Sequence, residues 1–96
     1  MARVVSIFEK SLGENHPNVA AALNNLASLL QATNRLGEAE PLLRRAFLIF
    51  KSSLGFQHPN SQTVLNNHAG LLEAMGRTQE QILATLRELA PEFFPP

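Results

Sequence analysis

The sequence has no cysteine, no net charge and no long apolar run, and each absence excludes a class of protein. Without cysteine, the 96 residues form neither a disulfide framework nor a thiolate metal site. Eight basic residues balance eight acidic ones, and no cluster of lysine and arginine indicates a nucleic acid or an anionic membrane as a partner. The longest apolar runs have four or five residues, which is too short to span a membrane.

The motifs that carry catalysis in many enzymes are absent as well. The sequence has no glycine-rich phosphate loop, no nucleophile elbow and no His/Glu pair at metal-binding spacing. Paired carboxylates occur only as Glu38 and Glu40, which point to different sides of a helix. The N-terminal residues 1–6 lack the apolar core of a signal peptide. We therefore expect a cytoplasmic protein that is not an enzyme and that binds no cofactor and no metal.

Two stretches of the sequence occur almost twice, at the same offset of 42 residues. Residues 12–18 (LGENHPN) return as residues 54–60 (LGFQHPN), and residues 23–30 (LNNLASLL) return as residues 65–72 (LNNHAGLL). A fixed period of this length is typical of stacked supersecondary units, each of which buries its apolar face against its neighbours. The length of the chain allows one domain of this kind.

Apolar residues recur at helical spacing within each period, and this pattern predicts about five helices. Gly13 and Gly55 are good helix ends because glycine adopts a positive φ at little cost. Asn34 and its counterpart Gly76 are expected to close two further helices in the same way. Pro41 removes a helical hydrogen bond, so we expect a kink there unless the helix begins later. The predicted helices span residues 2–12, 17–33, 36–53, 59–75 and 79–90.

The repeat divides the chain into three unequal units and a tail. Residues 2–12 correspond to residues 44–54, so the first half of their repeat is missing, and we expect the chain to be a piece of a longer array. The apolar stripe of the last helix fits the earlier one only after a one-residue slip, and Thr78 with Gln81 predicts a capping box. The units are a trailing half-repeat over 2–12, a repeat over 13–54, a degenerate repeat over 55–90 and a Pro/Phe tail over 91–96.

The order of small and large residues resembles the signature of the tetratricopeptide repeat. Its elements here are Leu23-x-x-Leu26-Ala27-x-x-Leu30, followed by Ala39, Leu43 and Ala46. With the phrases Leu-Gly-x-x-His-Pro and Leu-Asn-Asn-Leu-Ala, the 42-residue period resembles the subfamily found in kinesin light chains. His68 departs from the pattern, which has leucine at that position. The resemblance implies an all-α, right-handed solenoid of antiparallel helix pairs.

The first helices of successive pairs are expected to line one concave wall. Asparagine suits peptide binding there because its amide offers both a donor and an acceptor to a ligand backbone. The resemblance points to the same positions, since this face commonly binds peptides in tetratricopeptide proteins. A second interpretation has equal weight: Asn24 with Asn66, or Asn25 with Asn67, hydrogen-bond neighbouring repeats and only hold the stack. The predicted wall consists of Ala21, Asn24, Asn25, Ser28, Gln31, Thr63, Asn66, Asn67, Gly70 and Glu73.

The sequence leaves two other functions open beside peptide binding. A structural element that self-assembles through open repeat ends would form a homodimer, because the incomplete first repeat lacks an apolar partner. A regulatory segment of a larger enzyme or signalling protein would use the same fold. In every case the partner is a protein or peptide whose identity the sequence does not give. The residues assigned to self-association are Val4, Ile7, Phe8, Phe93 and Phe94.

The three histidines are given structural roles. His16 and His58 occupy the same loop position one repeat apart, so they do not converge as zinc ligands and are expected to be turn and helix-start residues. His68 lies on the apolar face of its helix, where we expect a packing residue that softens an end surface.

The second helix of the full repeat carries a charged stretch that is interpreted as a solvated outer face. Glu40 and Arg44 are four residues apart, in the order that favours a helical ion pair. The predicted wall has no Lys/Arg set that would clamp a terminal carboxylate, which argues against that mode of binding. The outer face consists of Glu38, Glu40, Arg44 and Arg45.

Overall fold

The computed structural model describes residues 16–91, and this part of the chain holds four α-helices and no strand. The bounds agree with the predicted ones to within one residue at either end. The predicted helix over residues 2–12 and the tail beyond residue 91 lie outside the described residues. The helices are α2 (Pro17–Ala32), α3 (Leu36–Leu54), α4 (Pro59–Ala74) and α5 (Gln79–Leu89).

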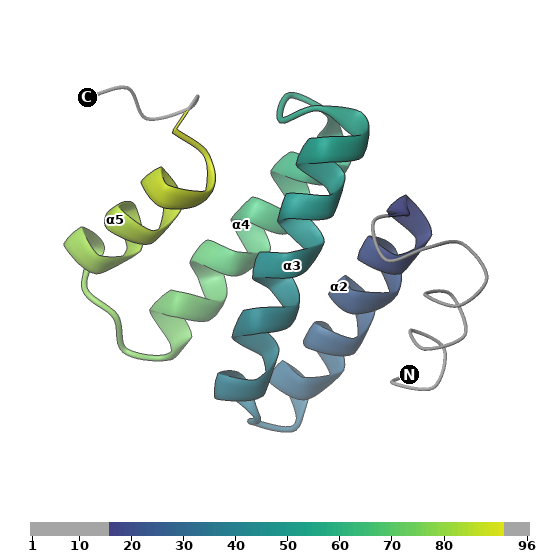
Figure 1. The fold of residues 1–96 in the computed structure, drawn as a ribbon. Helices are drawn as coiled ribbons and strands as arrows, with labels where there is room; N and C mark the ends of the chain where they lie inside the picture. Colours follow the sequence, from purple (N-terminus) through teal and green to yellow (C-terminus); the bar gives the residue numbers. More distant parts are fainter. Residues whose placement is uncertain (1–15, 92–96) are drawn as a thin grey trace.

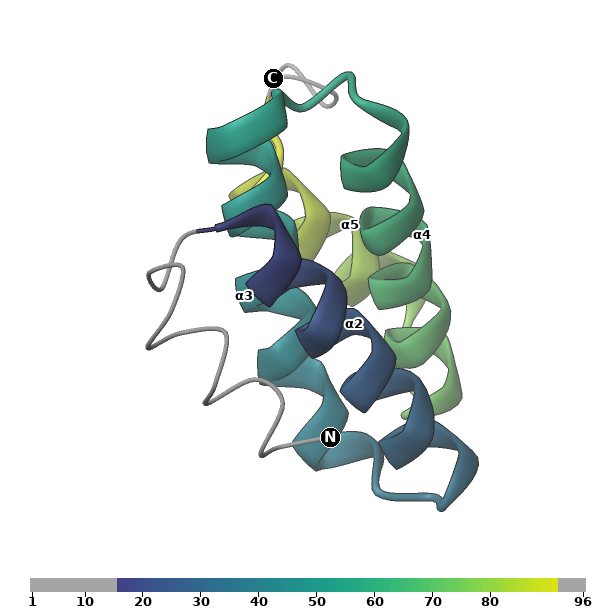
Figure 2. The same ribbon diagram turned by 90° about the vertical axis from the view of Figure 1, so that its right-hand side faces the viewer.

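Successive helices run in opposite directions and stack as helix pairs (Figure 1). Figure 2 shows that α2 and α4 lie side by side in one layer, with α3 and α5 behind them. The first helices of both pairs therefore share a face of the molecule, as the repeat predicts. The right-handed twist of the solenoid stays a prediction.

The core between the two layers is built from alternating small and large side chains. Ala27 and Ala46 are completely buried, which lets their helices approach closely. Phe47 is also completely buried, and Leu23 and Leu43 are each only 1% exposed. Close packing of this kind leaves few voids, so each large residue fills a space that the neighbouring alanines open.

Both first helices begin in the same way, with histidine as the N-cap and proline as the first helical residue. Nδ1 of His16 accepts a hydrogen bond from the backbone N–H of Asn18 at 3.0 Å, and Nδ1 of His58 accepts one from Asn60 at 3.1 Å. These bonds satisfy backbone donors that have no partner inside the helix. The helix-start role predicted for the two histidines is confirmed.

The same two helices end in equivalent Schellman motifs. Asn34 and Gly76 have positive φ values of 61° and 83°, and the residue after each donates its N–H to a carbonyl five residues back. Asn34 is the one non-glycine residue with positive φ among the described residues. The left-handed conformation predicted for both positions is confirmed.

Replacing Asn34 with glycine is expected to stabilise the fold by less than about 1 kcal/mol, because glycine takes a positive φ without the Cβ penalty that other residues bear. The chain provides its own precedent, since Gly76 fills the equivalent position. Thermal unfolding followed by circular dichroism measures the effect, and Gly76→Asn is the reciprocal variant, expected to be less stable. A loss of stability in Asn34→Gly would contradict the expectation.

α3 begins at Leu36 and continues through Pro41, so the alternative of a later helix start is wrong. Proline at this position lacks the N–H that would bond the carbonyl of Gly37, one turn earlier. Arg35 donates to both carboxylate oxygens of Glu38 at the start of the helix, with Nη2 to Oε1 at 2.7 Å, and both side chains are exposed. The kink at Pro41 stays a prediction.

α5 shows why the last repeat fits the pattern only after a slip. Three residues separate α2 from α3, whereas four separate α4 from α5. The buried residues Leu86, Leu89 and Ala90 consequently match Leu43, Ala46 and Phe47 at an offset of 43 rather than 42. The predicted one-residue slip therefore arises in the turn, where one extra residue is accommodated.

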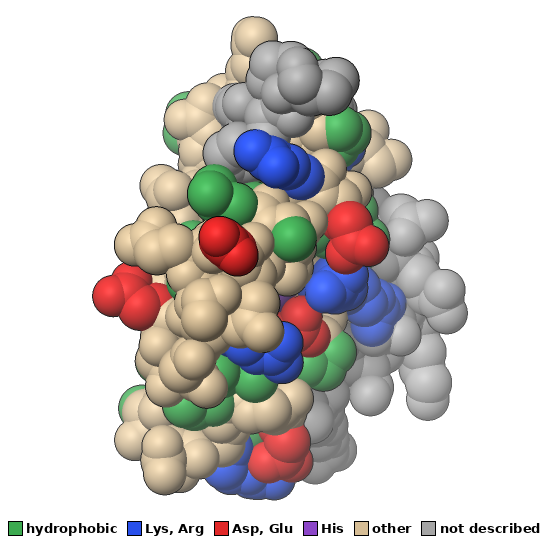
Figure 3. Space-filling model, turned by 90° about the vertical axis from the view of Figure 1, so that its left-hand side faces the viewer, with side chains coloured by type: hydrophobic (Ala, Val, Ile, Leu, Met, Phe, Trp, Pro, Cys, Tyr) green, Lys and Arg blue, Asp and Glu red, His purple; other side chains and the backbone are tan. Residues whose placement is uncertain are grey.

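The ends of α5 are held by specific hydrogen bonds. Thr78 and Gln81 form the predicted capping box at its start. At its other end, Nζ of Lys51 on α3 donates to the backbone carbonyl of Leu89 at 3.0 Å. Figure 3 looks onto the α5 side of the molecule, where acidic, basic and hydrophobic side chains lie scattered among the others. This end of the described stack thus presents a mixed surface.

Candidate functional site

The predicted wall residues all lie on α2 or α4, and none of them is buried. Asn24, Gln31 and Asn67 are half-buried, and the other seven are exposed. The two helices that carry them lie side by side in one layer (Figure 2). The structure therefore makes them accessible, although it does not gather all of them into one site.

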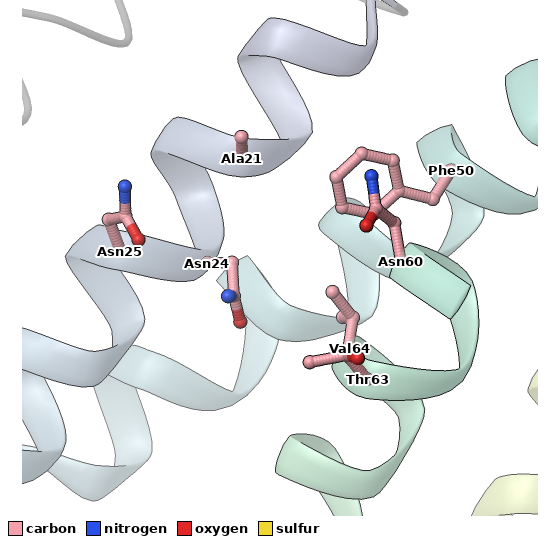
Figure 4. Close-up of a pocket in the computed structure, with 7 residues that line it drawn as sticks. All are labelled: Ala21, Asn24, Asn25, Phe50, Asn60, Thr63 and Val64. Atoms are coloured by element: carbon pink, nitrogen blue, oxygen red, sulfur yellow. The ribbon is translucent and has the colours of Figure 1, made fainter. Parts of the chain in front are cut away.

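Four of the ten wall residues meet at a hollow of about 160 Å³ between α2 and α4. Ala21, Asn24 and Asn25 line it from α2, and Thr63 lines it from α4 (Figure 4). The other six wall residues do not line this hollow. Three further residues do so, and the sequence reasoning did not assign them to the wall: Phe50, Asn60 and Val64.

Of the three additional residues, only Asn60 carried a sequence signal that places it beside the wall. Asn60 is the counterpart of Asn18 in the internal repeat and follows the histidine cap, which fixes the backbone around it. Phe50 and Val64 belong to apolar stripes, which place them in the core, and they are indeed only 4% and 1% exposed. Their remaining edge is enough to form an apolar floor to the hollow. A stripe pattern alone does not show which core residues reach a surface depression.

The chemistry of the hollow combines this apolar floor with an uncharged polar rim. Side-chain amides of Asn24, Asn25 and Asn60 and the hydroxyl of Thr63 supply hydrogen-bond donors and acceptors. None of the seven described residues that line it carries a charge. In Figure 4, Asn24 points toward Thr63 and Val64, while the amide of Asn25 points away from them. The arrangement suits an uncharged ligand with both apolar and hydrogen-bonding groups.

A hydrogen bond crosses from one repeat to the next beside the hollow. Nδ2 of Asn67 on α4 donates to Oδ1 of Asn24 on α2 at 3.2 Å, and both side chains are half-buried. The sequence suggested a bond between Asn24 and Asn66, or between Asn25 and Asn67. The observed bond instead joins Asn24 of the first pair to Asn67 of the second. Asn25 and Asn66 make no side-chain hydrogen bond among the described residues. One asparagine of each pair thus holds the stack, and the other remains available.

His68 is completely buried and occupies the position at which the first repeat has Leu26. Its Nε2 lies 3.2 Å from Oε1 of Glu40 on α3, and its Nδ1 is buried without a hydrogen-bond partner. An ionised carboxylate only accepts, so Nε2 is the protonated nitrogen and Nδ1 carries the lone pair. The packing role predicted for His68 is confirmed, but it lies in the interior rather than at an end surface.

Glu40 does not belong to a solvated outer face, which corrects the interpretation of the charged stretch. Its side chain is only 19% exposed, and Oε1 accepts from Nη2 of Arg44 at 3.1 Å as well as facing His68. The ion pair with Arg44 is the predicted one. Amphipathic spacing places Glu40 near the edge of the polar face of α3. Its carboxylate turns toward the interior because it contacts His68 on α4.

The electrostatics of this cluster favour neutral His68 and ionised Glu40. Burial lowers the pKa of His68, and the hydrogen bond to Glu40 offsets this effect only in part. Burial tends to raise the pKa of Glu40, but the hydrogen bonds with Arg44 and His68 outweigh it, and the pKa is lowered. Both shifts are the usual response to desolvation opposed by charge-assisted hydrogen bonds.

Other kinds of site find no support among residues 16–91. No group of three or more His, Cys, Asp or Glu side chains there could hold a metal ion. None of the described helices combines the length and the apolar character that crossing a membrane requires. The residues assigned to self-association, Val4, Ile7, Phe8, Phe93 and Phe94, lie outside the described part of the chain.

Comparison with known proteins gives one result. Residues 19–60 match the family model of the tetratricopeptide repeat. The match supports a tetratricopeptide repeat protein. It extends from the first turn of α2 to the start of α4, and so covers one period of the internal repeat. No curated protein matches the sequence. As a class, tetratricopeptide repeats are protein-interaction modules, and the hollow lies between α2, in the matched segment, and α4.

Proposed function

We propose that this tetratricopeptide repeat chain binds an extended peptide segment of a partner protein in the hollow between α2 and α4. The observation that carries the proposal is the composition of the hollow: an apolar floor of Phe50 and Val64 beside a rim of amides. Amides suit a peptide backbone because they offer a donor and an acceptor together. The kinesin-light-chain-like subfamily and a concave, right-handed stack are part of the same proposal.

The volume of the hollow sets the size of the group that enters it. At about 160 Å³ it is comparable to the engineered apolar cavity of about 150 Å³ that binds benzene. One side chain of leucine or phenylalanine size therefore fills it. The flanking backbone then lies along the amide rim. Charged side chains are disfavoured at this point, because the hollow would remove their water without offering an opposite charge.

Filling the hollow from within is expected to abolish binding. Leucine in place of Ala21 would occupy the space that the ligand side chain needs, and Ala21 is exposed, so the fold tolerates the change. Random dodecapeptides displayed on phage are selected against the chain, and the strongest binder is measured by fluorescence anisotropy. Ala21→Leu is expected to weaken that binding at least about tenfold, a difference of about 1.4 kcal/mol.

Ala84→Leu provides the matched control for this experiment. Ala84 is exposed on α5, which contributes no residue to the hollow, so the same substitution there is expected to leave binding unchanged. Circular dichroism checks that both variants keep the helicity of the parent chain. Equal binding by Ala21→Leu and the parent chain would show that the selected peptide does not use the hollow and would overturn the proposal.

A further inference from the structure

The two helix pairs of the described chain differ in what they bury. Every side chain that α2 and α3 bury is apolar, and α2 carries no charged residue. The second pair buries fewer apolar side chains. α5 buries Leu86 and Leu89, and α4 carries Ser61 and His68, the two buried polar side chains of the described residues. Regions with few buried apolar contacts open most readily, often as whole supersecondary units, and α4–α5 is such a unit.

His68 lies at the boundary between the two pairs. It is completely buried, and its Nε2 is 3.2 Å from Oε1 of Glu40 on α3. Its Nδ1 is the one buried side-chain nitrogen or oxygen among the described residues that has no hydrogen-bond partner. The imidazole has two nitrogens, and this site offers a single acceptor. A second proton on the ring would therefore be buried without a partner, whichever nitrogen received it.

The charges around His68 do not remove this cost. Burial has the largest effect and lowers the pKa of His68, the hydrogen bond with Glu40 opposes the shift, and the charge of Arg44 adds to it. Glu40 is also shared, because its Oε1 already accepts from Nη2 of Arg44 at 3.1 Å. The other charged residues of α4 and α5 are exposed: Glu73, Glu80, Arg87 and Glu88. The closed boundary thus favours a neutral ring.

We propose that α4 and α5 form an acid-released unit, in which protonation of His68 opens the boundary between the second helix pair and the first. The open form takes up the proton more readily than the closed form, so acid increases its population. The boundary is most stable above the ordinary histidine pKa of about 6.5 and weakens as the pH falls below it. A single proton raises the opening constant by at most about tenfold between pH 7.5 and pH 5.5.

Opening of this boundary would also dismantle the hollow. α4 supplies Asn60, Thr63 and Val64 to its lining, and the hydrogen bond from Asn67 to Asn24 crosses the same boundary. A proton taken up beside α3 therefore changes the surface that α4 forms with α2. The inference concerns the opening of the fold and does not depend on the proposed function.

Hydrogen exchange of backbone amides, followed by ¹H–¹⁵N spectra at pH 7.5 and pH 5.5, tests the inference. Protection factors are corrected for the intrinsic exchange rate at each pH. Leu23 and Phe47 report on the first pair, and Leu72 and Leu86 report on the second. The second pair is expected to be less protected than the first at both pH values. Its protection is expected to fall in acid, by up to about tenfold.

Two variants identify the group that takes up the proton. His68→Leu places at this position the residue that the first repeat has at Leu26, and it is expected to remove the fall in protection of the second pair. His58→Ser is the matched control, since it removes the imidazole that caps the same helix while serine retains a cap, and the fall is expected to remain. Circular dichroism at each pH checks that both variants keep the helicity of the parent chain.

Each outcome bears on one part of the proposal. Equal protection of the two pairs would show that the chain opens only as a whole, which would overturn the separate unit. The same fall in His68→Leu as in the parent chain would assign the proton to another group and overturn the role of His68. Lower protection of the second pair, with a fall in acid that only His68→Leu removes, would establish both.

Discussion

Replacing Phe47 with alanine is expected to lower the melting temperature by more than about 12 °C, because truncating a buried phenylalanine costs about 3–5 kcal/mol and each kcal/mol shifts a domain of this size by about 4–8 °C. Phe47 is completely buried on α3, in the core between the two layers of helices. Small domains have total stabilities near the low end of about 5–15 kcal/mol. The variant is therefore expected to be largely unfolded near body temperature.

Leu48→Ala is the matched control, since it shortens the next residue of the same helix. Leu48 is 46% exposed, so its truncation opens no cavity and is expected to change stability by about 0.5 kcal/mol or less. Thermal unfolding monitored by circular dichroism at 222 nm compares the three proteins. Similar melting temperatures for Phe47→Ala and Leu48→Ala would show that the core is not where the structure places it.

Acidification from pH 7 to pH 5 is expected to destabilise the parent chain through His68. Its pKa is lowered in the folded state by burial, so the unfolded chain binds the proton more readily. Stability is therefore complete above the ordinary histidine pKa of about 6.5 and falls as the pH drops below that value. The added proton would sit on Nδ1, which is buried without an acceptor. The lowered pKa of Glu40 adds a loss of the same sign, in the acidic range below its ordinary value.

His68→Leu is expected to flatten this pH dependence, because leucine restores the residue that the first repeat has at Leu26. Glu40 keeps its ion pair with Arg44 in that variant. His58→Ser provides the control: serine retains an N-cap, removes a different imidazole and is expected to leave the loss at low pH in place. The pH dependence of the three proteins is compared through melting temperatures measured at several pH values between 5 and 7.5. An unchanged slope in His68→Leu would assign the acid sensitivity to other groups.

The helices of this chain were predictable because local sequence determines where they begin and end. His16 and His58 are followed by proline, and Asn34 and Gly76 stand where a positive φ is needed, so four boundaries could be placed from these signals alone. The 42-residue offset then predicted the stacking of pairs. A periodic sequence constrains its fold at two levels. Local signals determine where each helix begins and ends, and each helix pair must also pack against the next pair in the stack.

The details of the candidate site were less predictable because they depend on the relative rotation of two helices. Asn24 pairs with Asn67 and not with its equivalent Asn66, since a helix face turns by about 100° per residue and adjacent positions compete for the same partner. Glu40 turns inward because His68 stands on the next helix, a relation that spans 28 residues. Such pairings are set by tertiary packing, which spacing within one helix does not reveal.

The additional residue in the turn between α4 and α5 shows where a helical repeat can differ in length from its neighbour. An insertion within a helix would rotate everything after it by about 100° and bring polar residues into the core. Placed in the turn, the insertion lets α5 start one position later and present Leu86, Leu89 and Ala90 to the interior. The buried positions are kept while the offset between the two units changes from 42 to 43 residues. One extra residue is thus accommodated between the helices of a repeat without changing which positions of the second helix face the core.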